Sequence, residues 1–181
     1  MPLPRFTRLA ATEQTRIVDV ATRHIAERGI SNIALNDLAD EAGISRSALY
    51  NYFDGRQDLI DVVTQSALTA VTQALEPWQP QPSEPEFWAT FFASFQRLRA
   101  LLHAQPELRI ILEAADSSSL DSWIDGFFAD AVRLGLVAAT NMPLIRAVTG
   151  AVIAAVDALE LARPESSTPE ELQHVLQRVW N

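Results

Sequence analysis

The organisation of this chain is decided by residues 39–52, which read ADEAGISRSALYNY. Ala39 is small enough to let two helices cross closely, and Gly43 permits a sharp turn between them. Ile44 is placed to fill the core beneath that turn, and Ser45 can cap the helix that follows. The stretch therefore predicts two short helices joined by a tight turn.

The second of these helices presents polar side chains on one side. Leu49 and Phe53 are four residues apart, so they face inward together. The side chains left on or near the solvent side are Arg46, Ser47, Tyr50, Asn51 and Tyr52. Arginine can bind guanine through two hydrogen bonds, asparagine can read adenine, and tyrosine hydroxyls can hold phosphate oxygens. This surface therefore fits the major groove of double-stranded DNA.

Apolar residues recur three and four positions apart on both sides of this stretch, which predicts a chain that is nearly all helix. Prolines at positions 77, 80, 82 and 85 predict a stiff loop that no helix crosses. We expect about nine helices in total. The first carries Ile17, Ala21 and Ile25 and ends at Gly29, the seventh is opened by Ser117 to Ser119 and reaches 136, and the last begins with the capping box at Thr168 and Glu171. The others are expected at 35–42, 45–53, 56–76, 86–104, 106–115 and 143–162.

Residues 14–60 resemble the DNA-binding domain of the TetR family of bacterial transcriptional regulators. The resemblance rests on Ala21, Gly29, Leu38, Ala39, Ser45, Arg46, Leu49, Tyr50, Tyr52, Phe53 and Arg56 at the family's spacing. A match at so many positions is specific, whereas a lone Ala-Gly-Ser turn would be weak. The resemblance implies an all-α homodimer with a helix-turn-helix DNA-binding domain at 1–55 and a helical effector-binding and dimerisation domain at 56–181. It also implies a repressor that binds a palindromic operator and is released by a small effector.

The resemblance further implies roles for single residues of the DNA-binding domain. Arg46, Ser47 and Asn51 would reach bases or nearby phosphates. Tyr50 and Tyr52 would touch the DNA backbone, and Arg56 would bind phosphate where the next helix begins. Ser45 belongs to the same predicted interface as the cap of the exposed helix. The alternative is a buried three-helix core without a DNA role.

Three departures from the family pattern weaken the expected phosphate contacts. Ala34 stands where the family usually has a capping Thr or Ser, and Asp54 stands where Lys is common. Ser47 and Ala48 replace a common Gly-Thr pair. An N-terminal arm with two arginines, Arg5 and Arg8, is a candidate to compensate as a minor-groove or backbone tail, with an inert tail as the alternative.

Aromatic side chains are dense in the helices expected at 86–104 and up to 136. Aromatic clefts between helices are common sites for apolar or aromatic ligands. The predicted effector-binding residues are Trp88, Phe91, Phe92, Phe95, Trp123 and Phe127. The alternative is an aromatic core without a cavity.

Small residues recur three and four apart in 143–162, which permits close approach of another helix. In the family resembled, the last two helices of each subunit form a four-helix dimer interface. The predicted interface residues are Gly150, Ala151, Ala154, Leu172, Val175 and Val179. Because 143–162 is apolar over most of its circumference, we expect it to be buried on several sides. The alternative is an intramolecular core without a partner.

Composition limits the function classes. The net charge of -9 argues against a chain that coats nucleic acid or anionic membranes over its whole surface, so any DNA contact must be local. Residues 1–60 are nearly neutral, and most of the acidic excess lies after them. Without a cysteine there is no disulfide, thiol nucleophile or thiolate metal site. We expect a soluble, cytoplasmic protein with no membrane partner, because we see no signal peptide and no long uncharged apolar run.

Catalytic patterns are missing from the sequence. We find no nucleophile with a base, no Gly-rich phosphate loop and no histidine pair at ligand spacing, so we expect no enzyme activity, cofactor or metal. One alternative is an enzyme or carrier that uses the aromatic region while the N-terminal helices merely support it. A second is an activator, or an architectural DNA binder that needs no effector.

Overall fold

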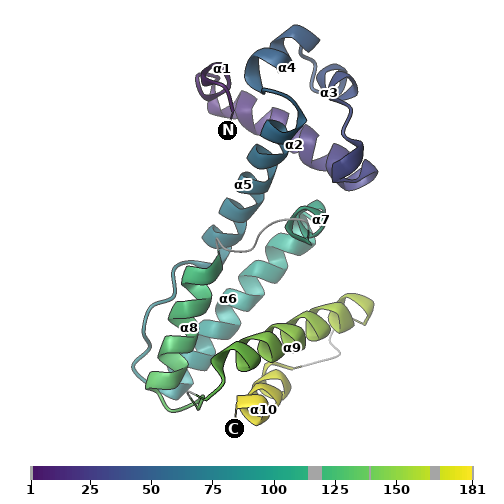
Figure 1. Cartoon of the computed structure of the whole chain (residues 1–181). Helices are drawn as coiled ribbons and strands as arrows, with labels where there is room; N and C mark the ends of the chain where they lie inside the picture. Colours follow the sequence, from purple (N-terminus) through teal and green to yellow (C-terminus); the bar gives the residue numbers. More distant parts are fainter. Residues whose placement is uncertain (1, 114–119, 139, 164–167, 181) are drawn as a thin grey trace. The chain divides into compact units, whose positions relative to one another are not determined.

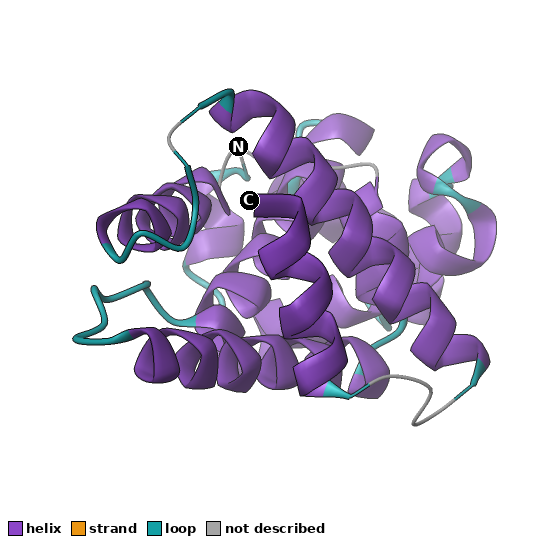
Figure 2. Cartoon of the chain, turned by 90° about the horizontal axis from the view of Figure 1, so that it is seen from below, coloured by secondary structure: helices purple, strands orange, loops and turns teal. Residues whose placement is uncertain are grey.

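In the computed structural model, the described residues 2–113, 120–138, 140–163 and 168–180 form helices and loops without any strand (Figures 1 and 2). This confirms the all-α prediction. The helices are α1 Pro4–Thr7, α2 Ala11–Arg28, the 3-10 turn η1 Ile30–Asn32, α3 Leu35–Glu41, α4 Arg46–Tyr52, α5 Arg56–Leu75, α6 Glu84–Ala104, α7 Glu107–Glu113, α8 Asp121–Arg133, α9 Met142–Ala162 and α10 Pro169–Trp180.

The described part of the chain thus has ten α-helices where about nine were expected. The additional helix is α1, one turn within the arm that was expected to be a tail. The other helices lie at the predicted places, with ends that differ by a few residues. The opening predicted at Ser117 to Ser119 lies outside the described residues.

The chain divides into two compact units, each described here by itself. Unit 1 comprises Met1–Ala74 and Ala100–Leu120, and unit 2 comprises Leu75–Arg99 and Asp121–Asn181. These two units are defined by which residues pack together. The boundary predicted after residue 55 instead separates a DNA-binding from an effector-binding domain, and it stays a prediction.

Unit 1 is built around α2. The stripe of Ile17, Ala21 and Ile25 is fully buried, as the spacing predicts, and it belongs to one apolar core with residues of α3, α4 and α5. Leu108 and Ile111 of α7 complete this core. Helices α2, α3 and α4 are therefore held in place by shared burial and not by helix propensity alone.

Unit 2 has an aromatic core. Phe127 of α8 lies with its ring centroid 5.0 Å from Phe87 of α6 and 5.8 Å from Trp180 of α10. Trp88 stacks on Trp180 with an interplanar angle of 14° and a centroid distance of 5.2 Å. Helices from three separate parts of the sequence therefore meet at this cluster.

The proline-rich loop before α6 is fixed by one buried carboxylate. Asp130 of α8 accepts a 3.1 Å hydrogen bond from the Trp78 indole and a 2.8 Å bond from the backbone N–H of Gln81. Arg133 donates to the same side chain, with Nε at 2.9 Å. Because a buried carboxylate is costly without partners, these donors lock the loop onto α8.

The start of α10 confirms the predicted capping box. The Glu171 N–H donates to Thr168 Oγ1 over 3.2 Å, and the Thr168 N–H donates to a carboxylate oxygen of Glu171 over 2.9 Å. Pro169 occupies the first helical position, where its missing N–H costs nothing.

Candidate nucleic-acid interface

The turn between α3 and α4 has the geometry that its sequence predicts. Gly43 has a φ of +62°, in the left-handed region that favours glycine. The N–H of Ile44 donates to the Ala39 carbonyl over 3.0 Å and closes the turn. Ala39 is fully buried, so α3 packs closely on its neighbours. The way α4 is set against α3 therefore follows from the turn at Gly43 and from the small side chain of Ala39.

Helix α4 is capped and anchored as expected. The Ser45 hydroxyl accepts a 3.1 Å hydrogen bond from the Ala48 N–H, which satisfies one of the free donors at the helix start. Leu49 and Phe53 are each 1% exposed and belong to the core of unit 1. The inward side of α4 is therefore fixed, and its opposite side faces solvent.

Four of the predicted DNA-binding residues share that solvent side. Arg46, Ser47, Tyr50 and Asn51 are all exposed, and Tyr50 has 54% of its surface accessible although it is a large aromatic residue. The Arg46 guanidinium lies 3.4 Å from a carboxylate oxygen of Asp40, and both side chains are mostly in water. An ion pair so exposed is weak, so Arg46 can exchange Asp40 for another acceptor at little cost.

Tyr52 and Arg56 are placed differently from these four. Tyr52 is half-buried, and its ring packs 6.2 Å from the ring of Phe6 in the N-terminal arm. Arg56 is exposed, and its guanidinium donates a 2.7 Å hydrogen bond to the Ser31 carbonyl. Contacts of both residues with the DNA backbone stay predictions, and each side chain also has a structural role.

The six predicted effector residues lie in unit 2, and most of them fill its aromatic core instead of lining a cavity. Phe91 and Phe127 have ring centroids 5.3 Å apart, and Trp123 stacks on Phe127 at 5.4 Å. Phe95 stacks on Phe91 at 6.1 Å. The rings pack against one another, as in the alternative of an aromatic core. The indole N–H of Trp123 is buried without a hydrogen-bond partner among the described residues.

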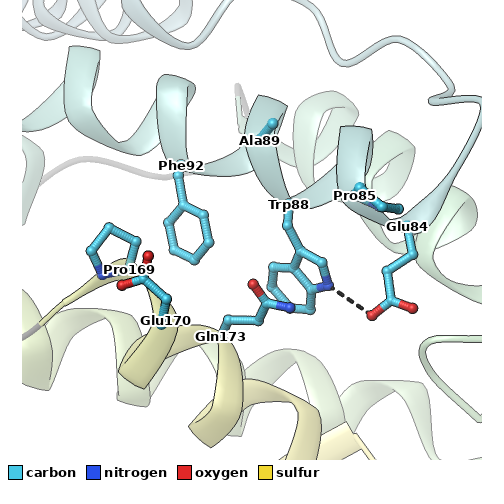
Figure 3. A pocket seen from close by; sticks show the side chains of 8 residues that line it. All are labelled: Glu84, Pro85, Trp88, Ala89, Phe92, Pro169, Glu170 and Gln173. Carbon is cyan, nitrogen blue, oxygen red and sulfur yellow. Dashed lines mark hydrogen bonds between the residues drawn. The ribbon is translucent and has the colours of Figure 1, made fainter.

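Trp88 and Phe92 also reach a cleft of about 410 Å³ on the surface of unit 2 (Figure 3). The cleft lies between the start of α6 and the start of α10 and is lined by Glu84, Pro85, Trp88, Ala89, Phe92, Pro169, Glu170 and Gln173. The Trp88 indole donates a 3.2 Å hydrogen bond to the Glu84 carboxylate, drawn as a dashed line in Figure 3. The sequence pattern pointed to Trp88 and Phe92 but missed the polar rim, because its residues come from two distant segments.

The predicted dimer residues divide into two groups. Gly150, Ala151 and Ala154 of α9 and Val175 of α10 are exposed. Leu172, in contrast, is buried in the core of unit 2, and Val179 packs partly against that core. The burial of α9 on several sides, expected from its composition, is wrong within a single chain, where Thr149 is its one buried residue.

Helix α9 buries one side and exposes the other. Met142, Ile145 and Val152 pack against the aromatic core, whereas the opposite apolar side is uncovered. Among the described residues, α9 is the one helix long and apolar enough to cross a membrane by length and composition, and 6% of that window is buried. A single such helix is weak evidence for a membrane span, since interface and core helices have the same composition.

Comparison with protein families finds a match over the helix-turn-helix region. The family model described as "Bacterial regulatory proteins, tetR family" matches residues 17–63. The "HTH-type transcriptional repressor KstR2" of Rhodococcus jostii is 34% identical over 55 residues, which are 30% of this chain and 27% of that protein. The "HTH-type transcriptional regulator EthR" of Mycobacterium tuberculosis is 26% identical over 136 residues, 67% of this chain and 63% of that protein. The chain thus spans about a quarter of the first relative's length.

Solved structures share the fold over nearly the whole chain. A TetR-family transcriptional regulator from Haemophilus influenzae superposes with a TM-score of 0.68 at 18% identity and covers 93% of this chain and 94% of its own. A TetR family regulator from Chloroflexus aurantiacus has a TM-score of 0.67 at 18% identity and covers 99% and 93%. The likeness extends through unit 2, where sequence similarity is weak.

Proposed function

Because this chain belongs to the TetR family of helix-turn-helix transcriptional regulators, we propose that it represses transcription by binding a palindromic operator as a homodimer and leaves the DNA when a small molecule binds. The family is one of regulators, which agrees with the prediction that the chain is not an enzyme. A regulator of this kind acts in the cytoplasm, where the DNA is.

The observation that carries the proposal is the division of α4 into two sides. Its buried side is held by Leu49 and Phe53, and its exposed side carries Arg46, Ser47, Tyr50 and Asn51. A rigid helix with outward donors and acceptors can read base edges in the major groove, while its tyrosine holds a phosphate. Ser45, Tyr52 and Arg56 support this helix and extend the proposed contact to the DNA backbone.

Dimerisation through α9 and α10 would complete the DNA-binding unit. Gly150, Ala151 and Ala154 form an exposed side of small residues, which lets a second helix approach closely. Among the described residues, a Cβ added to Gly150 would meet no atom within 4 Å outside its own stretch of helix, so this surface is open in one chain. A partner that covers it would also remove the exposed apolar side of α9 from water. Leu172 would then support the interface from behind.

The proposed effector is a small apolar or aromatic molecule held by unit 2. The cleft beside Trp88 and Phe92 offers an aromatic wall with polar groups at its rim, the usual composition of a ligand site. Phe91, Phe95, Trp123 and Phe127 lie in the aromatic cluster behind it. A ligand lowers DNA affinity only if it binds more tightly to the conformation that DNA disfavours.

Selection of bound sequences from random DNA, followed by titration of the recovered site, tests the proposal. Arg46→Ala should weaken specific binding about ten- to hundredfold, the value of one bidentate base contact. Arg46→Lys keeps the charge but not the planar fork, so it should lose discrimination between sites more than overall affinity. Helix content by circular dichroism controls for folding. Recovery of no preferred site would contradict the proposal.

The purified chain and the recovered operator also distinguish the proposed repressor from an enzyme or carrier, an activator and an architectural DNA binder. An enzyme or carrier would bind ligand without shifting operator DNA in a gel. An activator would raise transcription from the recovered site in a purified system, whereas a repressor lowers it. An architectural DNA binder would hold its site equally well at every effector concentration.

A further inference from the structure

We propose that the N-terminal arm, residues 2–9, is a preformed second DNA contact in which Arg5 and Arg8 bind the phosphate backbone beside the groove that α4 enters. The inference rests on the proposed DNA binding by α4. It assigns to the arm a fixed position and a definite ligand, the phosphodiester oxygens, where the sequence left an inert tail as an equal alternative.

The arm is attached to the end of α4 in two ways. The backbone N–H of Leu3 donates a 2.9 Å hydrogen bond to the carbonyl oxygen of Tyr52. Phe6 is 4% exposed, and its ring centroid lies 4.8 Å from that of Phe53 and 6.2 Å from that of Tyr52. Figure 1 shows α1 in this place, next to α4 within unit 1. Phe53, which anchors the end of α4 in the core, is thus also the residue on which the arm packs.

A third attachment holds the end of the arm to α2. The Gln14 side-chain amide donates a 2.9 Å hydrogen bond to the Leu9 carbonyl and a longer one, 3.5 Å, to the Thr7 carbonyl. Leu9 itself packs against the core of unit 1. Because both ends of the arm are held before DNA arrives, binding would not have to meet the entropy cost of ordering it.

The two arginines point away from these attachments. Arg5 lies in α1, and Arg8 caps its end three residues later with helical backbone angles, so the two side chains lie on the same side of this turn, while Phe6 faces the core. Both side chains are exposed, and among the described residues neither guanidinium makes a hydrogen bond or an ion pair. Other arginines of unit 1 are engaged, for example Arg28 with Asp37 at 2.7 Å and Arg56 with the Ser31 carbonyl.

Phosphate is the ligand that fits this pair. Two unpaired guanidinium groups on a rigid turn beside α4 would lie next to the DNA backbone if α4 enters the groove, and arginine binds phosphate oxygens through paired N–H groups. The contact would also add positive charge near the end of α4, which is followed by the acidic residue Asp54. A positive group there matters more in a chain whose net charge is -9.

The test measures the affinity of the full chain for its selected operator as a function of salt. For the double variant Arg5→Ala, Arg8→Ala we expect the slope of log K against log salt concentration to fall by about 1.8, because each phosphate contact contributes about 0.9. Affinity for unrelated DNA should fall by roughly the same factor as affinity for the operator, since phosphates carry no sequence. Arg23→Ala, an exposed arginine of α2, is the matched control and should leave the slope unchanged.

A second variant tests whether the arm must be fixed. Phe6→Leu keeps an apolar anchor and both arginines, so it should keep the salt slope. Phe6→Ser removes that anchor, so it should lose a large part of the salt slope, while thermal unfolding shows that the remaining helices are intact. If the unmodified chain binds no DNA, this inference and the proposed function both fail. If it binds DNA and the double variant keeps the full slope and affinity, the arm inference alone is overturned.

Discussion

The indole N–H of Trp180 donates a 2.9 Å hydrogen bond to the hydroxyl of Thr149, and both side chains are buried. This bond joins the last residue of α10 to the middle of α9. Trp180 also stacks on Trp88 in the aromatic core. The two helices proposed to form the dimer interface are therefore held together inside one chain before any partner binds.

Thr149→Val should destabilise the chain by about 1 to 3 kcal/mol, because it leaves the Trp180 indole donor unpaired in the core while keeping the side-chain shape. The free energy of unfolding in urea, followed by tryptophan fluorescence, measures the loss. Thr69→Val on α5 is the control, since Thr69 is exposed and donates only to its own helix. An unchanged denaturation midpoint for Thr149→Val would show that the bond contributes nothing net.

Ala34→Ser should stabilise the chain by about 0.5 to 2 kcal/mol. Ala34 occupies the N-cap of α3 with extended backbone angles and offers no side-chain acceptor to the free N–H groups of the first turn. A serine hydroxyl can supply that acceptor without changing the backbone. Thermal unfolding measures the gain, and Ala34→Val, which cannot cap, should give none. Equal melting temperatures for the Ser and Val variants would contradict the capping argument.

Ala154→Glu should convert the proposed dimer into monomers, because it places a charge on the open apolar side of α9. Ala154 is exposed, so the fold of the single chain should persist. Sedimentation velocity measures the oligomeric state. Operator affinity should fall with it, because we expect the dimer to hold two recognition surfaces about 34 to 36 Å apart, or a small multiple of that, on a palindromic site. Gln96→Glu adds the same charge to the exposed side of α6 as a control. A variant that stays dimeric would place the interface elsewhere.

Titration of aromatic ligands, followed by tryptophan fluorescence with and without operator, should show weaker ligand binding on DNA. Coupling of about 1 to 3 kcal/mol corresponds to a 5- to 150-fold effect, and by linkage the ligand must weaken operator binding by the same factor. Phe92→Ala should reduce ligand affinity more than Phe95→Ala, because Phe92 lines the cleft and Phe95 does not. Equal ligand affinity in both titrations would remove this site from the control of DNA release.

Much of the DNA-binding region was predictable from sequence because its determinants are local. A cap such as Ser45, a left-handed turn at Gly43 and the four-residue spacing of Leu49 and Phe53 act within one or two helical turns. Their geometry is set by backbone sterics and helix period, so the residue types alone imply the exposed side of α4.

Other features depend on segments that are distant in sequence. The arm is positioned by Phe6 against Phe53, and Leu172 turns toward its own core although its spacing also suits a partner helix. Periodicity says which residues are apolar on one side of a helix, but not whether the same chain or a second one covers that side. The sequence by itself therefore determined the α-helices from α2 onward, the caps at Ser45 and Thr168, and the polar surface of α4. Only the tertiary structure decided which aromatic rings fill the core and which reach the cleft, because that choice depends on how separate helices share the available volume.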